Sequence, residues 1–231
     1  MNHYFSMTHL APKRSLLRIW LVSVAVVGLT FAAASYAAPD TAIETPEALV
    51  QRLTSDVLEG MKADPSIRTG NRQSLVGLIE AKVLPNVDFE KTTRLASGKY
   101  WRQATPDQQK ALVAEFESTL LRIYGGALSA VKPQTVIEVR PGRYAPDATD
   151  VVVRTLIRQP DGDPITVDYR LERTGDAWKV YDFGVMNVWL VENYRNQFSS
   201  LIAAGGVDGL IKSLAERNRS AMRPGTAVPA V

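Results

Sequence analysis

Residues 178–198 read WKVYDFGVMNVWLVENYRNQF, and within them the residue pattern changes from that of a strand to that of a helix. The first half alternates as a β-strand does when both of its faces are covered. From Val188 the apolar residues recur at helical spacing, through Tyr194 and Phe198. Asn187 stands at the change, and Asn tolerates a positive φ better than most residues. We therefore expect a last strand that leads almost directly into an amphipathic helix beginning at Val188.

Strict alternation along this strand has consequences for its side chains. It places Val180 and Asp182 on one face, and Tyr181 and Phe183 on the other. Asp182 is then a candidate buried acid, although a hydrogen bond at the end of the strand is the ordinary interpretation. No residue of the segment resembles a nucleophile or a metal ligand, so we interpret it as a wall of a container.

The N-terminal residues 1–37 have the pattern of a secretory signal. Three basic residues within 13–18 precede an uncharged apolar run, Ile19–Ala34, of 16 residues. That run is shorter than the roughly 20 residues that span a bilayer, although an uncleaved N-terminal anchor remains the alternative. Ser35 and Ala37 supply small side chains before an expected cleavage after Ala37, so we expect the mature chain to be exported.

Cleavage there changes the charge and the available chemistry. The chain carries 27 Lys and Arg against 24 Asp and Glu, and loss of three basic residues with the signal leaves 24 of each. A neutral chain argues against nucleic-acid binding, which needs a concentrated basic surface. Both histidines, His3 and His9, leave with the signal, and the sequence has no Cys. This excludes Ser-His and Cys-His nucleophiles, imidazole or thiolate metal sites and disulfides in the mature chain.

Helix signals dominate the first half of the mature chain. Thr45 precedes a Pro and an acid, and apolar residues then recur every four positions as far as Asp64. A second helix is expected over about 72–84. Thr105 and Gln108 form a capping-box pattern, and Gly125-Gly126 is expected to loosen or end the helix that this pattern starts.

Strand signals follow. Four strands are expected, two of them joined to the next by hairpin-like turns, so the sheet is mainly antiparallel. After it we expect a helix to about Ala203, a break at Gly205-Gly206, a last helix from Asp208 to about Asn218 and a flexible tail over 219–231. This order predicts an α+β domain over 38–218, with a cavity wherever the inward side chains of helices and sheet do not meet. The expected strands are about 134–140, 151–158, 165–173 and 177–185.

Taken together, these segments resemble the MlaC family, also called toluene-tolerance auxiliary proteins. Each motif is weak alone, but their order over residues 45–218 is specific. One departure stands in the turn between strand and helix, where the family usually has Glu-Gly and then Ser and this chain has Met186, Asn187 and Trp189. The matching segments are Leu84-Pro85, Asp88-Phe89, LASGKYWRQATPDQQ at 95–109, Phe116, Tyr124, Ile165–Leu171, Trp178–Asp182, NYRNQF at 193–198 and GVDGL at 206–210.

The resemblance implies a fold, a function and partners. The fold would be a curved, NTF2-like sheet of four mainly antiparallel strands, merged with a helical subdomain around an apolar cavity. The function would be that of a periplasmic phospholipid carrier, without a cofactor, that maintains the lipid asymmetry of the outer membrane. Its partners would be phospholipid, an outer-membrane lipoprotein complex and an inner-membrane ABC transporter with an MCE-domain subunit. We expect a monomer.

The resemblance also suggests which side chains bind the lipid. For each candidate the alternative is an ordinary core position, because apolar stripes usually pack on one another. Arg195 is a candidate contact for the headgroup or for a partner, and otherwise a solvated charge. Trp189 is expected either to narrow the mouth of the pocket or to alter a docking surface. The lipid-binding candidates are Leu84, Phe89, Leu95, Tyr100, Trp101, Phe116, Leu120, Tyr124, Val153, Val167, Tyr169, Leu171, Val180, Val185, Val188, Tyr194 and Phe198.

Two other classes of function stay open at this point. Some NTF2-like domains are enzymes that use a pocket carboxylate as general base, and Asp168 or Asp182 is the candidate here. No second acid-base partner, nucleophile elbow or metal cluster accompanies either of them in the sequence. The other class is an interaction module with a solid core and no cavity.

Overall fold

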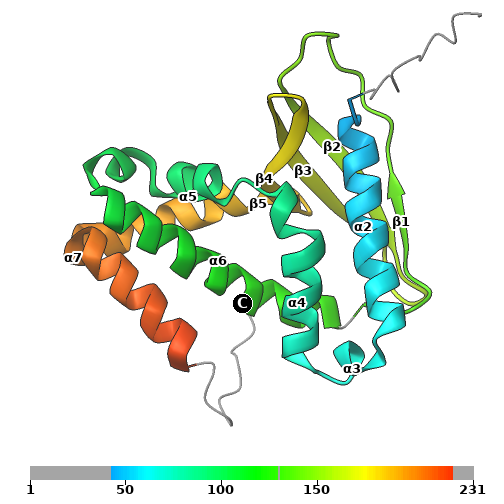
Figure 1. The fold of residues 1–231 in the computed structure, drawn as a ribbon, viewed down its shortest axis with the longest axis horizontal. Helices are drawn as coiled ribbons and strands as arrows, with labels where there is room; N and C mark the ends of the chain where they lie inside the picture. Colours follow the sequence, from blue (N-terminus) through cyan, green and yellow to red (C-terminus); the bar gives the residue numbers. More distant parts are fainter. Residues whose placement is uncertain (1–42, 130, 221–231) are drawn as a thin grey trace, which may run out of the picture. The chain divides into compact units, whose positions relative to one another are not determined.

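The computed structural model describes residues 43–129 and 131–220. The expected signal peptide, its cleavage site and the segment 221–231 lie outside the described residues. In the described part, helices come first, an antiparallel sheet follows, and a long kinked helix ends the chain (Figure 1). This is the α+β order that the sequence predicts.

Helices occupy the chain before the sheet, and two of them begin with the caps that the sequence predicts. Thr45 accepts a hydrogen bond from the N–H of Ala48 at 3.2 Å. Thr105 and Gln108 form a reciprocal capping box, in which each backbone N–H donates to the other side chain, at 2.9 and 3.2 Å. The segments are α2 (Pro46–Ala63), α3 (Pro65–Arg68), α4 (Arg72–Lys82), the 3₁₀ turn η1 (Leu84–Asn86), α5 (Phe89–Ser97), the 3₁₀ turn η2 (Gly98–Gln103) and α6 (Pro106–Ser129).

The sequence predicts that Gly125-Gly126 loosens or ends the helix, and the structure excludes an end there, because α6 continues to Ser129. A glycine inside a helix costs about 1 kcal/mol relative to alanine. Gly125 is buried, and a β-carbon at this position would lie 3.5 Å from Cδ2 of Leu75 in α4. Packing of α4 against α6 at this point offsets the low helix propensity of the glycine pair.

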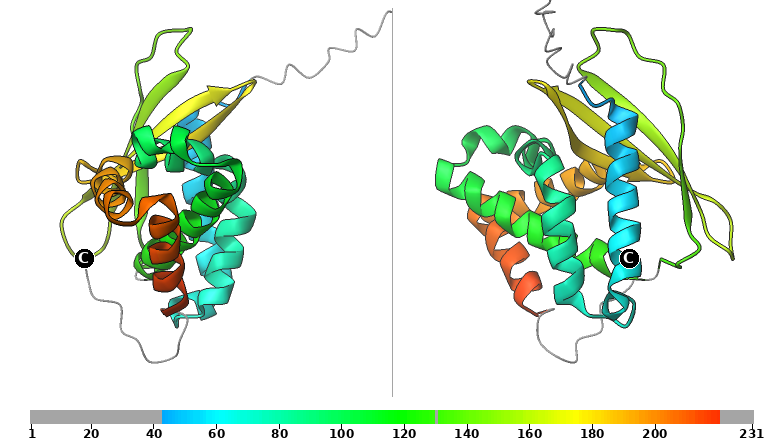
Figure 2. Two further views of the ribbon diagram at one scale, coloured as in Figure 1. Left: turned by 90° about the vertical axis from the view of Figure 1, so that its left-hand side faces the viewer. Right: turned by 45° about the vertical axis from the view of Figure 1, so that its right-hand side comes forward.

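The sheet has five strands instead of the expected four. Each strand pairs with the next along the chain, and every pairing is antiparallel. The missed strand has two residues and pairs with the end of the strand before it. In the ribbon views α2 lies across one face of the sheet, next to α4 (Figures 1 and 2). The strands are β1 (Val136–Val139), β2 (Asp150–Arg158), β3 (Ile165–Thr174), β4 (Ala177–Val185) and β5 (Val188–Trp189).

The turn after β4 differs from the predicted hinge. Met186 and Asn187 both have positive φ, 49° and 66°, and they form a two-residue hairpin turn. Val188 therefore belongs to β5, and the prediction that a helix begins there is wrong. The helix α7 (Leu190–Ser220) follows β5 directly. The predicted positive φ at Asn187 is present, but Met186 shares it.

A β-bulge in β4 overturns the strict alternation expected there. Leu171 pairs with Val180 and Arg170 pairs with Asp182, so Tyr181 is the extra residue. Residues directly opposite one another share a face. Val180 therefore faces the same side as Phe183, which lies opposite Tyr169, and Asp182 faces the other way.

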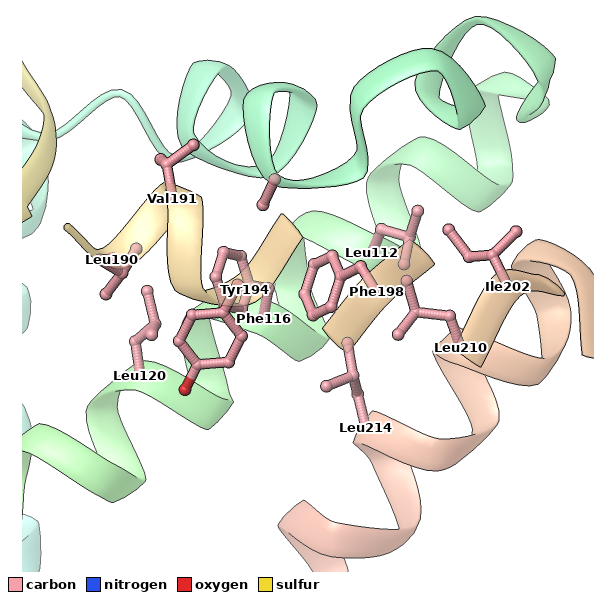
Figure 3. Close-up of a cluster of buried hydrophobic side chains, with 11 residues drawn as sticks. Leu112, Phe116, Leu120, Leu190, Val191, Tyr194, Phe198, Ile202, Leu210 and Leu214 are labelled. Atoms are coloured by element: carbon pink, nitrogen blue, oxygen red, sulfur yellow. The ribbon is translucent and has the colours of Figure 1, made fainter. Parts of the chain in front are cut away.

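The long helix α7 turns sharply at Gly206, where φ is 69° and ψ is −174°. The predicted break is thus present, but the helix continues to Ser220, two residues beyond the predicted end at Asn218. Of the described helices, α7 alone has the length and composition of a membrane-crossing helix. It contributes Phe198 and Leu214 to the core of the domain, as a core helix does (Figure 3).

The core consists of three clusters of buried side chains. The helical cluster joins α5, α6 and α7, and Figure 3 shows most of it. The sheet cluster joins α2 to the sheet, and the α2–α4 cluster fills the space between the first helices. Their buried members are Ala96, Leu112, Phe116, Leu120, Leu190, Val191, Tyr194, Phe198, Ile202, Leu210 and Leu214; Leu49, Val50, Leu53, Val151, Val153, Leu171 and Val180; and Met61, Ile67, Leu75 and Ile79.

Candidate functional site

A cavity of about 430 Å³ lies where the three core clusters meet. Its wall includes Leu120 from the helical cluster, Val180 from the sheet cluster and Met61 from the α2–α4 cluster. The volume is in the range of about 300–1,000 Å³ that is typical of small-molecule sites. The surface that lines it is almost entirely apolar. The prediction of a module with a solid core is therefore wrong.

One face of the sheet forms one side of this cavity. Val167, Tyr169 and Phe183 share that face, because Tyr169 lies opposite Phe183 across β3 and β4. The ring of Phe183 packs edge-on against Tyr124 of α6, with 5.0 Å between the ring centroids. Burial raises the pKa of the Tyr169 hydroxyl to about 12, so this group is neutral at physiological pH.

The opposite side is formed by helices, chiefly α2. No residue of α2 was among the predicted site residues, although the spacing of Leu49, Leu53, Val57 and Met61 in the sequence is the signal that identifies the inward stripe of this helix. The lining residues that the prediction missed are Val50, Leu53, Thr54, Val57, Leu58, Met61, Ile79, Val83, Val87, Thr92, Leu121, Gly125, Val131, Thr135, Ile137, Ile157, Gln159, Ile165, Tyr181, Asp182, Phe183 and Leu190.

Eight of the predicted lipid-binding residues line the cavity. They come from η1, α5, α6, β3 and β4, so the cavity joins segments that are far apart in the sequence. They are Leu84, Phe89, Leu120, Tyr124, Val167, Tyr169, Val180 and Val185.

The remaining nine do not line it, and most of them are core residues. Phe116 is fully buried, and its ring packs edge-on against Tyr194 and Phe198, with centroid distances of 4.7 and 4.9 Å (Figure 3). Val188 is 63% exposed on β5 and faces away from the interior. The others are Leu95 and Tyr100, which pack against the helical cluster, Trp101, which is buried beside α6, and Val153 and Leu171 of the sheet cluster.

Arg195, the predicted headgroup contact, is also outside the cavity wall. It is an exposed residue of α7, and its Nε donates a hydrogen bond to the backbone carbonyl of Leu95 at 3.1 Å. Trp189 packs over the sheet instead of the cavity. A β-carbon at Gly184 would lie 3.0 Å from its indole, and the guanidinium of Arg170 lies 3.9 Å from its ring centroid.

Asp182 is the carboxylate that borders the cavity, and its own bonds hold it in place. It is 2% exposed, accepts a hydrogen bond from Arg170 Nη1 at 3.0 Å and accepts another from the N–H of Val191 at 3.0 Å. Burial raises the pKa of this carboxyl, and the Val191 N–H and Arg170 oppose the rise. A carboxylate engaged on both oxygens at the start of α7 is a structural cap, not a free general base.

Asp168, the other candidate general base, is not in the cavity wall. It pairs across the strands with Arg154, on the face of β3 opposite to Val167 and Tyr169, with 4.0 Å between Arg154 Nε and its carboxylate. Within residues 43–129 and 131–220 there is no group of three or more His, Cys, Asp or Glu that is arranged to hold a metal. The site therefore offers apolar surface and shape, and it does not assemble acid-base or metal chemistry.

A buried lysine, Lys91, packs against the lining residue Tyr181. Lys91 of α5 lies 3.5 Å above the centroid of the Tyr181 ring, 2.8 Å from Glu172 and 3.5 Å from Asp150. The Tyr181 hydroxyl donates to the Asp150 carboxylate at about 2.9 Å. The positive charge of Lys91 is therefore balanced by Asp150 and Glu172, and this cluster of side chains joins α5 to β2, β3 and β4.

A family model described as MlaC protein matches residues 51–216 of this chain. That match covers most of the described residues and every element that lines the cavity. The chain belongs to the MlaC family. Three residues of this MlaC chain depart from the family pattern. Met186 and Asn187 form a tight hairpin turn, and Trp189 stacks on Arg170, away from the cavity.

Relatives and a solved structure agree with this assignment. The toluene tolerance protein ttg2D of Pseudomonas putida is 28% identical over 189 residues, which is 81% of this chain and 87% of that protein. The intermembrane phospholipid transport system binding protein MlaC of Haemophilus influenzae is 23% identical over 201 residues, 85% of this chain and 92% of that protein. A phospholipid-binding protein of Ralstonia solanacearum, solved in complex with a phospholipid, is 42% identical with a TM-score of 0.73, over 77% of this chain and 98% of that one.

Proposed function

We propose that this MlaC chain is a periplasmic phospholipid carrier whose cavity holds acyl chains. The observation that carries the proposal is the apolar cavity of about 430 Å³, in a chain 42% identical to a protein solved with a phospholipid. The eight predicted residues on the cavity wall, Leu84, Phe89, Leu120, Tyr124, Val167, Tyr169, Val180 and Val185, are the proposed acyl-chain contacts.

The energetics of transfer suit such a cavity. Burial of one methylene is worth roughly 0.8 kcal/mol, so acyl chains do not cross water unaided. A membrane already provides the same burial, so a carrier needs an interior only about as apolar as the bilayer. Exchange of lipid then needs docking to a donor or an acceptor and no reaction on the carrier. Accordingly, we propose a transport protein rather than an enzyme.

The proposed partners and location follow the family. The carrier exchanges lipid with an outer-membrane lipoprotein complex and with an inner-membrane ABC transporter that has an MCE-domain subunit. The mature chain begins at Ala38, works as a monomer in the periplasm, binds no nucleic acid and needs no cofactor. Its neutral net charge suits brief contacts with different partners.

Native mass spectrometry of the exported protein tests this proposal. The full chain is expressed with its leader in a Gram-negative host and purified from the periplasm without detergent. We expect the mass of a chain beginning at Ala38 plus at least one phospholipid, identified by extraction. Protein that remains empty after incubation with phospholipid vesicles would overturn the carrier, and turnover of a small substrate by empty protein would favour the enzyme.

A further inference from the structure

The polar end of the proposed ligand has no place inside the cavity. Among the described residues, Asp182 is the one charged residue in the wall, and Arg170 and the N–H of Val191 already engage its carboxylate. The other polar side chains of the wall, such as Thr135 and Gln159, are neutral, so a phosphate placed there would lose its hydration without gaining a positively charged partner, which is unfavourable. The phosphate-bearing end must therefore leave the cavity at a point where donors or positive charges are available.

Three cationic side chains meet at one place directly behind the cavity wall. Lys62 at the end of α2, Arg68 in α3 and Lys132 in the connection between α6 and β1 line one small pocket. Three apolar residues, Leu58, Met61 and Val131, line both this pocket and the cavity. These shared residues place the three cations next to the cavity. In Figure 1, α3 and the last turn of α2 lie at the lower end of the helices.

These cations are not fully balanced by acids. Within the described part of the chain, neither Lys62 nor Arg68 forms an ion pair, while Lys132 pairs with the exposed Asp161. Asp64, the nearest acid in the sequence, accepts a hydrogen bond from the N–H of Ser66 at 2.9 Å and caps α3. The group of Lys62, Arg68 and Lys132, hereafter the cationic ring, thus keeps a net charge of about +1 once Asp161 and Asp64 are both counted.

Other cations beside the cavity are already engaged. Lys91 lies within 2.8 Å of Glu172 and 3.5 Å of Asp150. Arg170 lies within 3.0 Å of Asp182. Arg52 of α2 lies 2.8 Å from Glu44. Among the described residues, the cationic ring is therefore a place near the cavity with unbalanced positive charge, and two of its three members stand on helices.

We propose that the cationic ring binds the phosphodiester of the carried lipid, where its acyl chains leave the cavity past Leu58, Met61 and Val131. This inference rests on the proposed carrier function and names the recognition group of that site. Cationic side chains suit a phosphodiester because charge-assisted hydrogen bonds are about twice as strong as neutral ones. Arg68 also presents the planar fork that binds phosphate through two donors. The ring takes over the role that the sequence suggested for Arg195.

Charge reversal on the full exported protein tests the proposal. The double variant Lys62→Glu/Arg68→Glu is compared with Arg102→Glu/Lys110→Glu, which makes the same change in net charge at exposed positions outside the cavity wall and the small pocket. Each protein is stripped of lipid, incubated with phosphatidylglycerol vesicles and examined by native mass spectrometry. We expect the cationic-ring variant to retain about tenfold less lipid than wild type, and the control to match wild type.

The outcomes separate the ring from the carrier function. If wild type and both variants retain equal amounts of lipid, the cationic ring is excluded and the carrier stands. If wild type itself takes up no lipid, the proposed carrier function is overturned, and the proposal for the cationic ring, which rests on it, is overturned with it. Equal losses in both double variants would show a general charge effect and would also overturn the ring. Melting curves of both variants verify the fold, and we expect melting temperatures within about 3 °C of wild type, as for surface substitutions.

A free phosphate ion has the same chemistry as a lipid phosphate, so a second arm separates them. Inorganic phosphate is titrated calorimetrically into lipid-loaded and lipid-free wild type. A lipid headgroup in the ring blocks the ion, so we expect saturable phosphate binding to the lipid-free protein alone. Equal binding to both forms would show that the ring is vacant in the loaded carrier and would overturn the proposal.

Discussion

The carboxylate of Asp182 in β4 accepts the backbone N–H of Val191 in α7 at 3.0 Å, so the last long strand caps the helix that follows it. The same carboxylate accepts from Arg170 of β3. Because the β-bulge turns Asp182 away from the face of Val180, one acid fastens two strands and one helix at the edge of the cavity. The two elements of residues 178–198 are thus joined by a side chain as well as by the turn between them.

Replacement of Asp182 by Asn tests the cost of its burial. The pKa of Asp182 in the folded chain is above its ordinary value, so between these two values the folded state binds more protons than the unfolded one. Stability from this group therefore falls as pH rises through that range. Relative to wild type, the Asp182→Asn variant should therefore become more stable as the pH is raised above the ordinary pKa of an aspartate, measured by urea unfolding. A relative loss over the same range would contradict the raised pKa.

Two aromatic positions that the sequence treats alike should behave differently. Phe116→Ala empties a fully buried site and should lower the free energy of unfolding by about 3–5 kcal/mol. Tyr169→Glu places a carboxylate in the cavity wall, where it should abolish lipid retention by desolvation. Thermal melting and extraction of bound lipid distinguish the two. Normal lipid retention in Tyr169→Glu would remove this residue from the site.

Loss of Lys91 should loosen α5 from the sheet. Its ammonium group contacts Glu172, Asp150 and the Tyr181 ring, and the side chain is largely buried. We expect Lys91→Met to lower the free energy of unfolding by about 1–2 kcal/mol, since the stem can still pack while the cation–π and ionic contacts are lost. Lys110→Met, at an exposed position of α6, is the control and should remain within about 0.5 kcal/mol of wild type. Equal unfolding curves for the two variants would argue against a role of the buried ammonium group.

The neighbouring glycines in α7 provide a matched pair. Gly206 has φ of 69°, and alanine there should destabilise the protein by about 1–2 kcal/mol because of backbone strain. Gly205 has no positive φ and has open space around a β-carbon, so alanine there should stabilise by about 0.5–1 kcal/mol. Guanidinium unfolding of both variants measures the difference. Equal effects would show that the turn at Gly206 is not required.

Local signals made much of the fold predictable. The capping box of Thr105 and Gln108 depends on four neighbouring residues, so it is readable in the sequence. The bulge at Tyr181 is not, because tyrosine is equally suited to a regular strand and only the pairing with β3 creates the extra residue. Continuation of α6 through Gly125 was missed for a similar reason, since packing against Leu75 outweighs the local preference.

The candidate site was harder to predict than the fold, and α6 shows the reason. Phe116 and Leu120 stand one helical turn apart on the same apolar face. Phe116 meets Tyr194 and Phe198 across the interface, whereas Leu120 borders the cavity. Periodicity identifies the face that points inward but says nothing about the distance to the opposite wall. Whether an inward residue is core or lining is therefore a property of the assembled elements.

Both sides of the cavity carry β-branched side chains, Val50, Thr54 and Val57 of α2 among them, but the two sides differ in their most adaptable side chain. The sheet side is rich in β-branched residues such as Ile157, Val167 and Val185, which have few accessible rotamers. The helix side includes Leu58 and Met61, and methionine in particular is unbranched and adapts its shape. Tolerance for acyl chains of different length or with a double bond should therefore come from repacking of Leu58 and Met61 in α2, while the side chains of β3 and β4 keep their conformations.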